Sequence, residues 1–195
     1  LGQRARLRGP VSAMSTVLLL PGWLNSDADH WQSRWELLHG DRRVEQADWQ
    51  WPRRGDWMAR LDEALLALDG DAPVLLAAHS LGCQLVAAWA EHSQHTARVR
   101  GALLVAPPDT EREDMPPQLH NWRAIRRPRL PFPALAVVSS DDPYCVPERA
   151  AQMATDWGAQ LVVAGPRGHL NSDSGLGDWA EGHALLAGLV ASATR

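Results

Sequence analysis

The sequence predicts an α/β fold with a doubly wound, mainly parallel sheet of about six strands and helices on both faces. Two observations predict it: short apolar runs alternate with helix-like patterns along the chain, and the runs are apolar throughout instead of at every second residue. Strands of this kind are buried on both sides, as in parallel sheets that helices cover. The 195 residues are enough for a sizeable core and too few for two ordinary domains. We therefore expect residues 14–195 to form a single domain without a large cap.

Six short runs are the expected strands. The first is entirely apolar and stops at Pro21-Gly22, whereas the second is the weakest of the six. In chain order the expected strands are residues 17–20, 44–48, 73–78, 99–106, 135–139 and 160–164.

Five helices are expected around these strands. Ser26 is a suitable N-cap for the first helix. Within it, Trp31, Trp35 and Leu38 recur at helical spacing and share one face. Asp56 begins the second helix, which carries an apolar stripe of its own. The expected helices are residues 26–38, 56–70, 81–92, 147–157 and 179–192.

Two stretches have no regular pattern. Residues 107–133 contain seven of the fourteen prolines, and loops of this length are usually lids, binding loops or disordered segments. The position of this stretch between the fourth and fifth strands favours a short cap over the edge of the sheet. Residues 1–13 are rich in arginine but lack the apolar block of a secretory signal. We expect them to be a disordered leader or a translation scar, and we expect a cytoplasmic protein.

The composition argues against several classes of function. The net charge is −4 and the charges are well mixed, so no basic stripe is available for nucleic acid. No apolar run approaches the ~18 residues that a membrane helix needs. Cys83 and Cys145 are too few for a disulfide framework or a four-thiolate metal site. His92 and His95 lie near each other without a third ligand. We expect no metal, no cofactor, and neither a nucleic-acid nor a membrane partner.

A nucleophile motif follows the third expected strand. In open parallel sheets, ligands bind at the carboxyl ends of the strands, so the residues that follow each strand are the candidates for chemistry. Here the sequence Ala78-His79-Ser80-Leu81-Gly82 matches the strand–turn–helix pattern G-x-S-x-G with alanine at the first position. The pattern predicts a nucleophilic Ser80 at a helix N-terminus, although a serine that merely caps the helix would give similar letters. We expect His79 to serve packing instead of catalysis.

Suitable partners for Ser80 follow the fifth and sixth strands. A serine hydroxyl becomes a strong nucleophile when a histidine takes its proton and a carboxylate orients that histidine. Asp141 and Asp142 follow the fifth strand, and His169 follows the sixth, in the chain order Ser, acid, His of the α/β-hydrolases. Both aspartates are candidates for the acid, and we prefer Asp142 because it directly precedes Pro143 at the end of its loop.

Further residues are expected around this triad. The oxyanion hole requires two backbone N–H donors, for which we predict Leu81, directly after the serine, and Trp23, in the turn after the first strand. The chain contains ten tryptophans among its twelve aromatic residues. From their positions beside the expected site, we predict Trp122 and Trp49 in the substrate pocket, together with Cys145 after the acid loop. The alternatives are packing at the rim for Trp49 and a structural role for Cys145.

With these residues assembled, the chain resembles the retinoblastoma-binding-protein/YdeN family of small serine hydrolases in the α/β-hydrolase superfamily. The segments that carry the resemblance are LLLPGWLNSDADHWQSRWE (18–36), AAHSLGC (77–83), LPFPALAVVSSDDPYC (130–145) and GHLNSDSGLGDWAEG (168–182). The resemblance implies a compact hydrolase with little or no cap domain. It also implies a triad of Ser80, Asp142 and His169, which favours Asp142 over Asp141.

The expected function is therefore that of a serine hydrolase, of carboxylesterase type. We expect it to cleave a small ester, thioester or activated amide through an acyl-enzyme, with a small-molecule acyl compound as its partner. The alternatives are an acyltransferase or a peptidase that uses the same triad, and a non-catalytic binding protein with the hydrolase fold.

Overall fold

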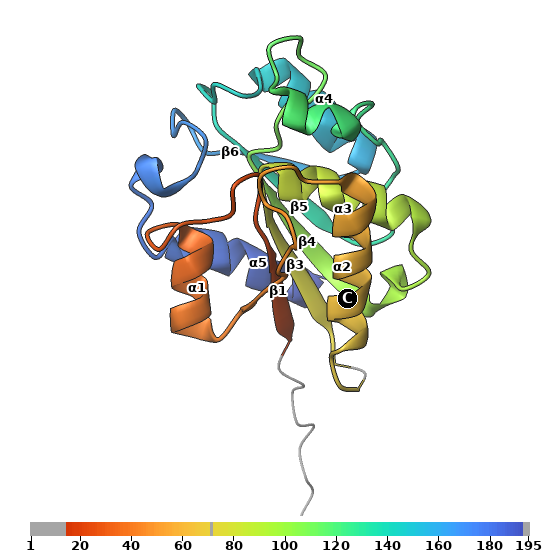
Figure 1. Ribbon diagram of the computed structural model, residues 1–195. Helices are drawn as coiled ribbons and strands as arrows, with labels where there is room; N and C mark the ends of the chain where they lie inside the picture. Colours follow the sequence, from red (N-terminus) through yellow and green to blue (C-terminus); the bar gives the residue numbers. More distant parts are fainter. Residues whose placement is uncertain (1–14, 71, 193–195) are drawn as a thin grey trace, which may run out of the picture.

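The computed structural model describes residues 15–70 and 72–192, and its centre is a six-stranded sheet in which all paired strands run parallel (Figure 1). The strand order is β2-β1-β3-β4-β5-β6, so the chain first builds one edge of the sheet and then crosses to the other. The strands are β1 (Thr16–Leu20), β2 (Arg42–Arg43), β3 (Val74–His79), β4 (Val99–Val105), β5 (Ala134–Val138) and β6 (Gln160–Val163). The prediction of a doubly wound parallel sheet is confirmed.

Helices cover both faces of the sheet. Helices α1 (Trp31–His39) and α5 (Ala180–Ser192) pack on one face, and α2 (Arg54–Leu66), α3 (Leu81–His92) and α4 (Pro147–Trp157) pack on the other (Figure 1). None of the helices in the described part of the chain has the length and apolar character needed to cross a bilayer.

The sheet separates two apolar cores, which explains why the central strands carry apolar side chains on both faces. In β1, Leu18 and Leu20 point into the core beneath α2, α3 and α4, whereas Val17 and Leu19 point into the core beneath α1 and α5. All six residues of β3 are buried. Six of the ten tryptophans are almost fully buried, so most of this unusual aromatic content packs the two cores: Trp31, Trp35, Trp57, Trp89, Trp122 and Trp157.

The second strand differs from the predicted one. β2 consists of Arg42–Arg43, not of residues 44–48. Val44 still donates its N–H to Leu19 at 2.9 Å, but the chain then turns, and the carboxylate of Asp48 accepts the N–H groups of the second and third residues after it. An aspartate that bonds to the following backbone in this way favours a turn over a strand.

The first helix begins later than predicted. It starts at Trp31 with His30 as its N-cap, because the hydroxyl of Ser26 bonds to the side chain of Gln32 at 2.7 Å instead of capping the helix. The ring of His30 accepts the backbone N–H of Gln32 at 3.1 Å, as an N-cap side chain does.

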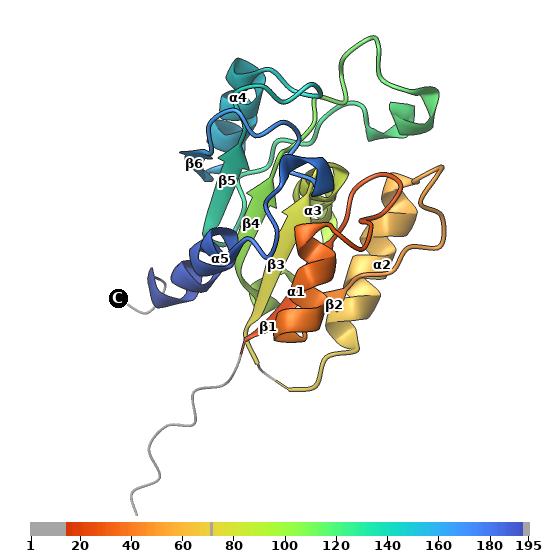
Figure 2. The same cartoon turned by 90° about the vertical axis from the view of Figure 1, so that its left-hand side faces the viewer.

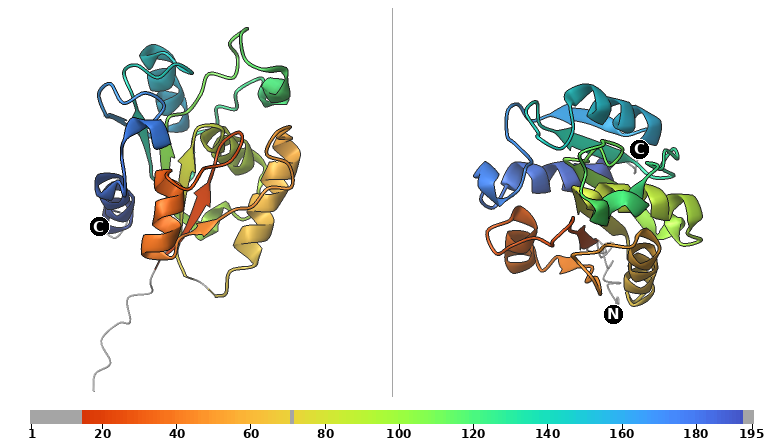
Figure 3. Two further views of the ribbon diagram at one scale, coloured as in Figure 1. Left: turned by 60° about the vertical axis from the view of Figure 1, so that its left-hand side comes forward. Right: turned by 45° about the horizontal axis from the view of Figure 1, so that its top comes forward.

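The proline-rich segment between β4 and β5 extends beyond the carboxyl ends of the strands and reaches over the start of α2 (Figures 2 and 3). It contains a short 3₁₀ helix, Pro117–Trp122, and the indole of Trp122 donates to the carbonyl of Pro52 at 2.9 Å. This segment is the short cap that the sequence predicts. The predicted leader, residues 1–13, lies outside the described residues.

Candidate active site

Ser80 occupies the sharp turn between β3 and α3. Its backbone has φ of +54° and ψ of −122°, a conformation that residues other than glycine rarely adopt. The turn is held by hydrogen bonds from the Ser80 N–H to Val105 at 2.8 Å and from the Cys83 N–H to Ser80 at 2.9 Å. A strained strand-to-helix turn of this kind raises a hydroxyl above the carboxyl edge of the sheet.

Two glycines let other backbone segments approach this turn closely. A Cβ atom on Gly82 would lie 2.2 Å from the carbonyl oxygen of Leu20, so the first turn of α3 rests directly against β1. A Cβ atom on Gly22 would lie 2.9 Å from the Cβ atom of Ser80. The loop after β1, which carries Trp23, therefore lies against the residue that carries the hydroxyl.

The imidazole of His169 bridges Ser80 and Asp142. Its Nε2 atom lies 2.8 Å from Oγ of Ser80, and its Nδ1 atom lies 3.0 Å and 2.9 Å from the two carboxylate oxygens of Asp142. The side chains of His169 and Asp142 are only 10% and 4% exposed. The carboxylate also accepts the backbone N–H of Tyr144 at 2.9 Å. The loops after β3, β5 and β6 thus bring the three predicted side chains together.

Asp141, the other candidate for the acid, faces the backbone of the loop that carries His169. Its carboxylate accepts the N–H of Gly168 and the hydroxyl of Ser139, each at 2.8 Å. The hydrogen bond from Gly168 and, to a smaller extent, the one from Ser139 lower the pKa of Asp141. Asp141 therefore shapes the turn before His169, and Asp142 alone of the two contacts the imidazole.

The two predicted oxyanion donors border the same cavity as Ser80. Leu81 is the first residue of α3, and Trp23 lies in the loop that Gly22 brings against the turn. Among the residues that the structure describes, no hydrogen-bond acceptor is seen for the backbone N–H of either Leu81 or Trp23. Two such donors, of which Leu81 is at the N-terminus of α3, can stabilise negative charge beside Ser80.

A cavity of about 250 Å³ opens beside Ser80 and His169. Much of its wall consists of apolar or aromatic side chains, which include Trp23, Leu24, Pro108, Met115, Pro116, Leu119 and Tyr144. The ring of Tyr144 meets that of His169 edge-on, with 4.6 Å between the centroids. A larger groove of about 640 Å³ runs along α2 but contains none of the three bridged side chains, so the smaller cavity is the candidate site.

The three side chains predicted for the pocket wall do not line this cavity. Trp122 is 1% exposed and packs edge-on against Trp57, with 5.4 Å between the ring centroids. Trp49 packs against the same indole from another side. Cys145 is buried, and burial raises the pKa of its thiol to about 12. The prediction failed because a large aromatic side chain in a loop packs into an apolar core as readily as it lines a pocket.

The residues that do form the wall above the site were missed. Met115 and Leu119 lie in the proline-rich segment, one at each side of Pro116-Pro117. Only Leu119 lies in the 3₁₀ helix, so no helical spacing in the sequence indicated that the two residues share a wall. His79 was expected only to serve packing, yet it borders the cavity, as does His30.

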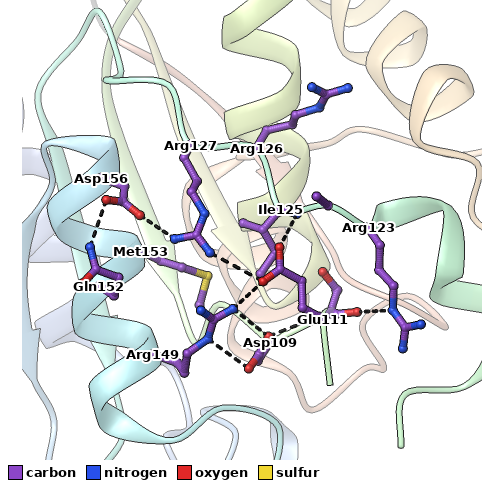
Figure 4. Close-up of polar contacts among 12 residues, drawn as sticks. Asp109, Glu111, Arg123, Ile125, Arg126, Arg127, Arg149, Gln152, Met153 and Asp156 are labelled. Carbon is purple, nitrogen blue, oxygen red and sulfur yellow. Dashed lines mark hydrogen bonds and ion pairs between the residues drawn. The ribbon is translucent and has the colours of Figure 1, made fainter. Parts of the chain in front are cut away.

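A network of arginines and carboxylates anchors this wall to α4 (Figure 4). Arg149 of α4 bonds twice to Asp109, at 3.1 Å each, and once to Glu111 at 2.7 Å. Glu111 in turn accepts the backbone N–H of Ile125 at 3.0 Å, and Arg127 pairs with Asp156 of α4 at 2.6 Å (Figure 4). Both ends of the proline-rich segment are therefore fixed to one helix by charged hydrogen bonds.

Acidification is expected to weaken the fold through His30. Burial lowers the pKa of His30 to about 4, so the folded protein keeps this ring neutral while the unfolded chain protonates it below about pH 6.5. Because the unfolded state then binds the extra proton, the free energy of unfolding falls as the pH falls from about 6.5 to 4. At pH 5 the expected loss from this residue is about 2 kcal/mol relative to pH 7.5.

Urea unfolding of the wild type and of His30→Asn at pH 7.5 and pH 5 measures this effect. Asparagine removes the titrating group and keeps an acceptor for the helix cap. The wild type should lose about 2 kcal/mol more than the variant on acidification. Equal losses in the two proteins would contradict the prediction.

Comparisons with known proteins bear on the family and the fold of this chain. A family model described as serine hydrolase matches residues 17–188. A YdeN-like protein of Pectobacterium atrosepticum is 29% identical over 92% of each chain, with a TM-score of 0.80. The ydeN gene product of B. subtilis is 21% identical over 91% of this chain and 100% of its own, with a TM-score of 0.70.

A more distant structure extends the comparison. A monoacylglycerol lipase of Paleococcus ferrophilus is 14% identical over 90% of this chain and 94% of its own, with a TM-score of 0.66. A search of curated proteins finds no match. At such low identity the likeness establishes the fold, which is that of the α/β-hydrolases.

Proposed function

Because this chain belongs to the serine hydrolase family, we propose that it hydrolyses small neutral esters through an acyl-enzyme on Ser80. The observation that carries the proposal is the bridging imidazole of His169, 2.8 Å from the Ser80 hydroxyl and 2.9 Å from the Asp142 carboxylate. A serine, a histidine and a carboxylate in this order of contact are the arrangement that makes a hydroxyl nucleophilic.

Each of the three residues has one role in the proposed reaction. As the Ser80 oxygen attacks the ester carbonyl, its proton passes to Nε2 of His169. The carboxylate of Asp142 accepts the hydrogen bond from Nδ1 and stabilises the imidazolium that forms. The alcohol leaves with the proton from Nε2, and water, activated by the same nitrogen, releases the acid from Ser80.

The backbone around Ser80 provides the remaining contribution. The carbonyl oxygen becomes negatively charged when it is attacked, and the N–H groups of Leu81 and Trp23 are proposed to receive it. Donors of this type contribute about 3–4 kcal/mol to the stabilisation of the transition state in serine proteases. Their backbone origin means that their position is fixed before the substrate arrives.

The cavity favours a short, uncharged acyl group. Its volume of about 250 Å³ lies at the lower limit of small-molecule sites, and the wall from Met115, Leu119 and Leu24 is apolar. No arginine is among the described residues that line it, and the chain contains no lysine to pair with a carboxylate on the substrate. An ester of a short or medium-length fatty acid fits these conditions.

Product analysis tests the type of reaction. The protein is incubated with p-nitrophenyl acetate, butyrate and octanoate, alone and with methanol or an amine as a competing acceptor, and with a peptide p-nitroanilide. The proposal predicts free acid as the main product and little cleavage of the anilide. A main product on the added acceptor would identify an acyltransferase, and faster cleavage of the anilide would identify a peptidase.

Met115→Ala is expected to shift the preference toward longer acyl chains. Removing this side chain enlarges the cavity on its apolar side, and each additional buried methylene is worth about 0.8 kcal/mol, or roughly fourfold in kcat/KM. The ratio of kcat/KM for octanoate over butyrate should rise about 4- to 10-fold. Met58→Ala, which alters a partly buried methionine on α2 outside the cavity, should leave the ratio unchanged. An unchanged ratio in Met115→Ala would place the acyl chain elsewhere.

A further inference from the structure

Two buried histidines connect the start of α1 with the backbone of His169. His30 and His79 are 3% and 5% exposed, and their rings meet edge-on with 4.6 Å between the centroids. Nε2 of His30 lies 3.3 Å from Nδ1 of His79, and Nε2 of His79 lies 2.8 Å from the carbonyl oxygen of His169. The proposed reaction makes no use of either ring.

The hydrogen-bond partners of His30 and His79 determine which ring nitrogens carry a proton. The backbone N–H of Gln32 donates to Nδ1 of His30 at 3.1 Å, so that nitrogen carries no proton. The proton of a neutral His30 must then be on Nε2, where it is donated to Nδ1 of His79. The proton of His79 is consequently on Nε2 and is donated to the carbonyl of His169. Burial lowers the pKa of both rings, which agrees with this neutral arrangement.

The hydrogen bond from His79 to His169 fixes a loop with an unfavourable backbone conformation. The residues on either side of His169 both have left-handed backbones, with φ of +60° at Gly168 and +50° at Leu170. The next carbonyl, that of Leu170, accepts the indole N–H of Trp31 at 3.0 Å. Two consecutive carbonyls of this loop therefore accept hydrogen bonds from buried rings, one from His79 at the end of β3 and one from Trp31 at the start of α1.

We propose that His30 and His79 are positioning residues that fix the backbone of His169 and so set the distance from its Nε2 to the Ser80 hydroxyl. His79 directly precedes Ser80 in the chain, so one residue connects the backbone of the nucleophile to the backbone of the base. The inference rests on the proposed function, since it concerns the geometry of that same reaction. Displacement of a reacting group by about 1 Å can reduce a rate about 100-fold.

Two substitutions at His30 distinguish the role of its Nδ1 atom from that of its Nε2 atom. His30→Asn keeps an oxygen near the position of Nδ1, so it can cap α1, but it cannot reach His79. His30→Gln can place an N–H near the position of Nε2 and donate it to His79, but it is a poorer cap. The proposal predicts that Gln retains kcat within about threefold, whereas Asn lowers kcat about 10- to 100-fold with little change in KM.

The Tm of the two variants is the second measurement, and it should rank them in the opposite order to kcat. Asparagine, which preserves the cap, should have the higher Tm, so a purely structural role of His30 would make the glutamine variant the less active one. Long-range ¹H–¹⁵N NMR spectra of the wild type should show both His30 and His79 protonated on Nε2. This measurement does not depend on turnover.

The possible outcomes separate this inference from the proposed function. A wild type that hydrolyses esters, together with an asparagine variant of unchanged kcat or with kcat values that follow Tm, would overturn the positioning role alone. Protonation of either ring on Nδ1 would overturn it as well. A wild type without esterase activity would overturn the proposed function, and the NMR spectra would still test the proton arrangement.

Discussion

Ser80→Ala is expected to lower kcat/KM for a short-chain ester by about 10⁴- to 10⁶-fold. In the proposed reaction the oxygen of this hydroxyl forms the bond to the acyl group, and the oxyanion donors alone would retain only a small residual rate. The same variant should lose stoichiometric labelling by a fluorophosphonate, which reacts with activated serine hydroxyls. Alanine adds no new contact in the turn, so the far-UV circular dichroism spectrum should remain that of the wild type.

Ser140→Ala is the matched control for this experiment. Ser140 is an exposed serine directly before the two aspartates of the acid loop, and its structural bond is made by its backbone N–H. Its variant should be labelled like the wild type, and mass spectrometry should locate the label on the peptide that contains Ser80. A wild type that does not react with the probe would indicate a binding protein with the hydrolase fold, and a label on another serine would refute the proposed nucleophile.

Gly82→Ala is expected to have the largest effect on stability. The added methyl group would lie 2.2 Å from the carbonyl oxygen of Leu20 and 3.0 Å from its carbonyl carbon, and both atoms belong to a buried strand that cannot move aside. Relief requires α3 to shift away from β1, which disrupts the packing of the core on that face. We expect a loss of at least about 3 kcal/mol, which corresponds to a fall in Tm of roughly 6–12 °C for a chain of this size.

Gly55→Ala provides the control for the alanine substitution itself. Gly55 lies in the first turn of α2, and a Cβ atom there would meet nothing within 4 Å. Alanine at such a position should leave the free energy of unfolding unchanged or raise it by up to about 1 kcal/mol, and Tm should not fall. Thermal unfolding followed by circular dichroism compares the two variants, and a Gly82→Ala protein as stable as Gly55→Ala would contradict the close approach of α3 and β1.

The strands of the centre of the sheet could be predicted because burial on both faces leaves a strong local signal. In β3 every residue is buried, and the chain there is apolar without interruption. The edge strand β2 gives no such signal, because Arg42 is exposed and Arg43 binds side chains of α1 and of the loop before it. The start of α1 was misplaced for a similar reason: Ser26 is a good cap in isolation, but its hydroxyl is used by Gln32.

The parts of the site could be predicted to different extents. Ser80 directly follows β3, and Asp142 and His169 lie in the loops that follow β5 and β6, so the parallel sheet brings all three to one edge. The cavity wall and the histidine pair depend on contacts between segments far apart in the chain. His30 and His79 are 49 residues apart, and no local pattern indicates that their rings meet.

The attachment of the proline-rich segment leaves its cavity-lining side chains free to vary. The segment is held by bonds to Arg149, Asp156 and the carbonyl of Pro52, and by bonds from Asp109 and Arg112 to the backbone of the acid loop. None of these bonds uses the side chain of Met115 or Leu119, which line the cavity. Its inner side chains can therefore be exchanged while the frame that aligns the proton transfer stays as it is. Under the proposed function, replacing these side chains would change the acyl group that fits the cavity and leave Ser80, Asp142 and His169 in place.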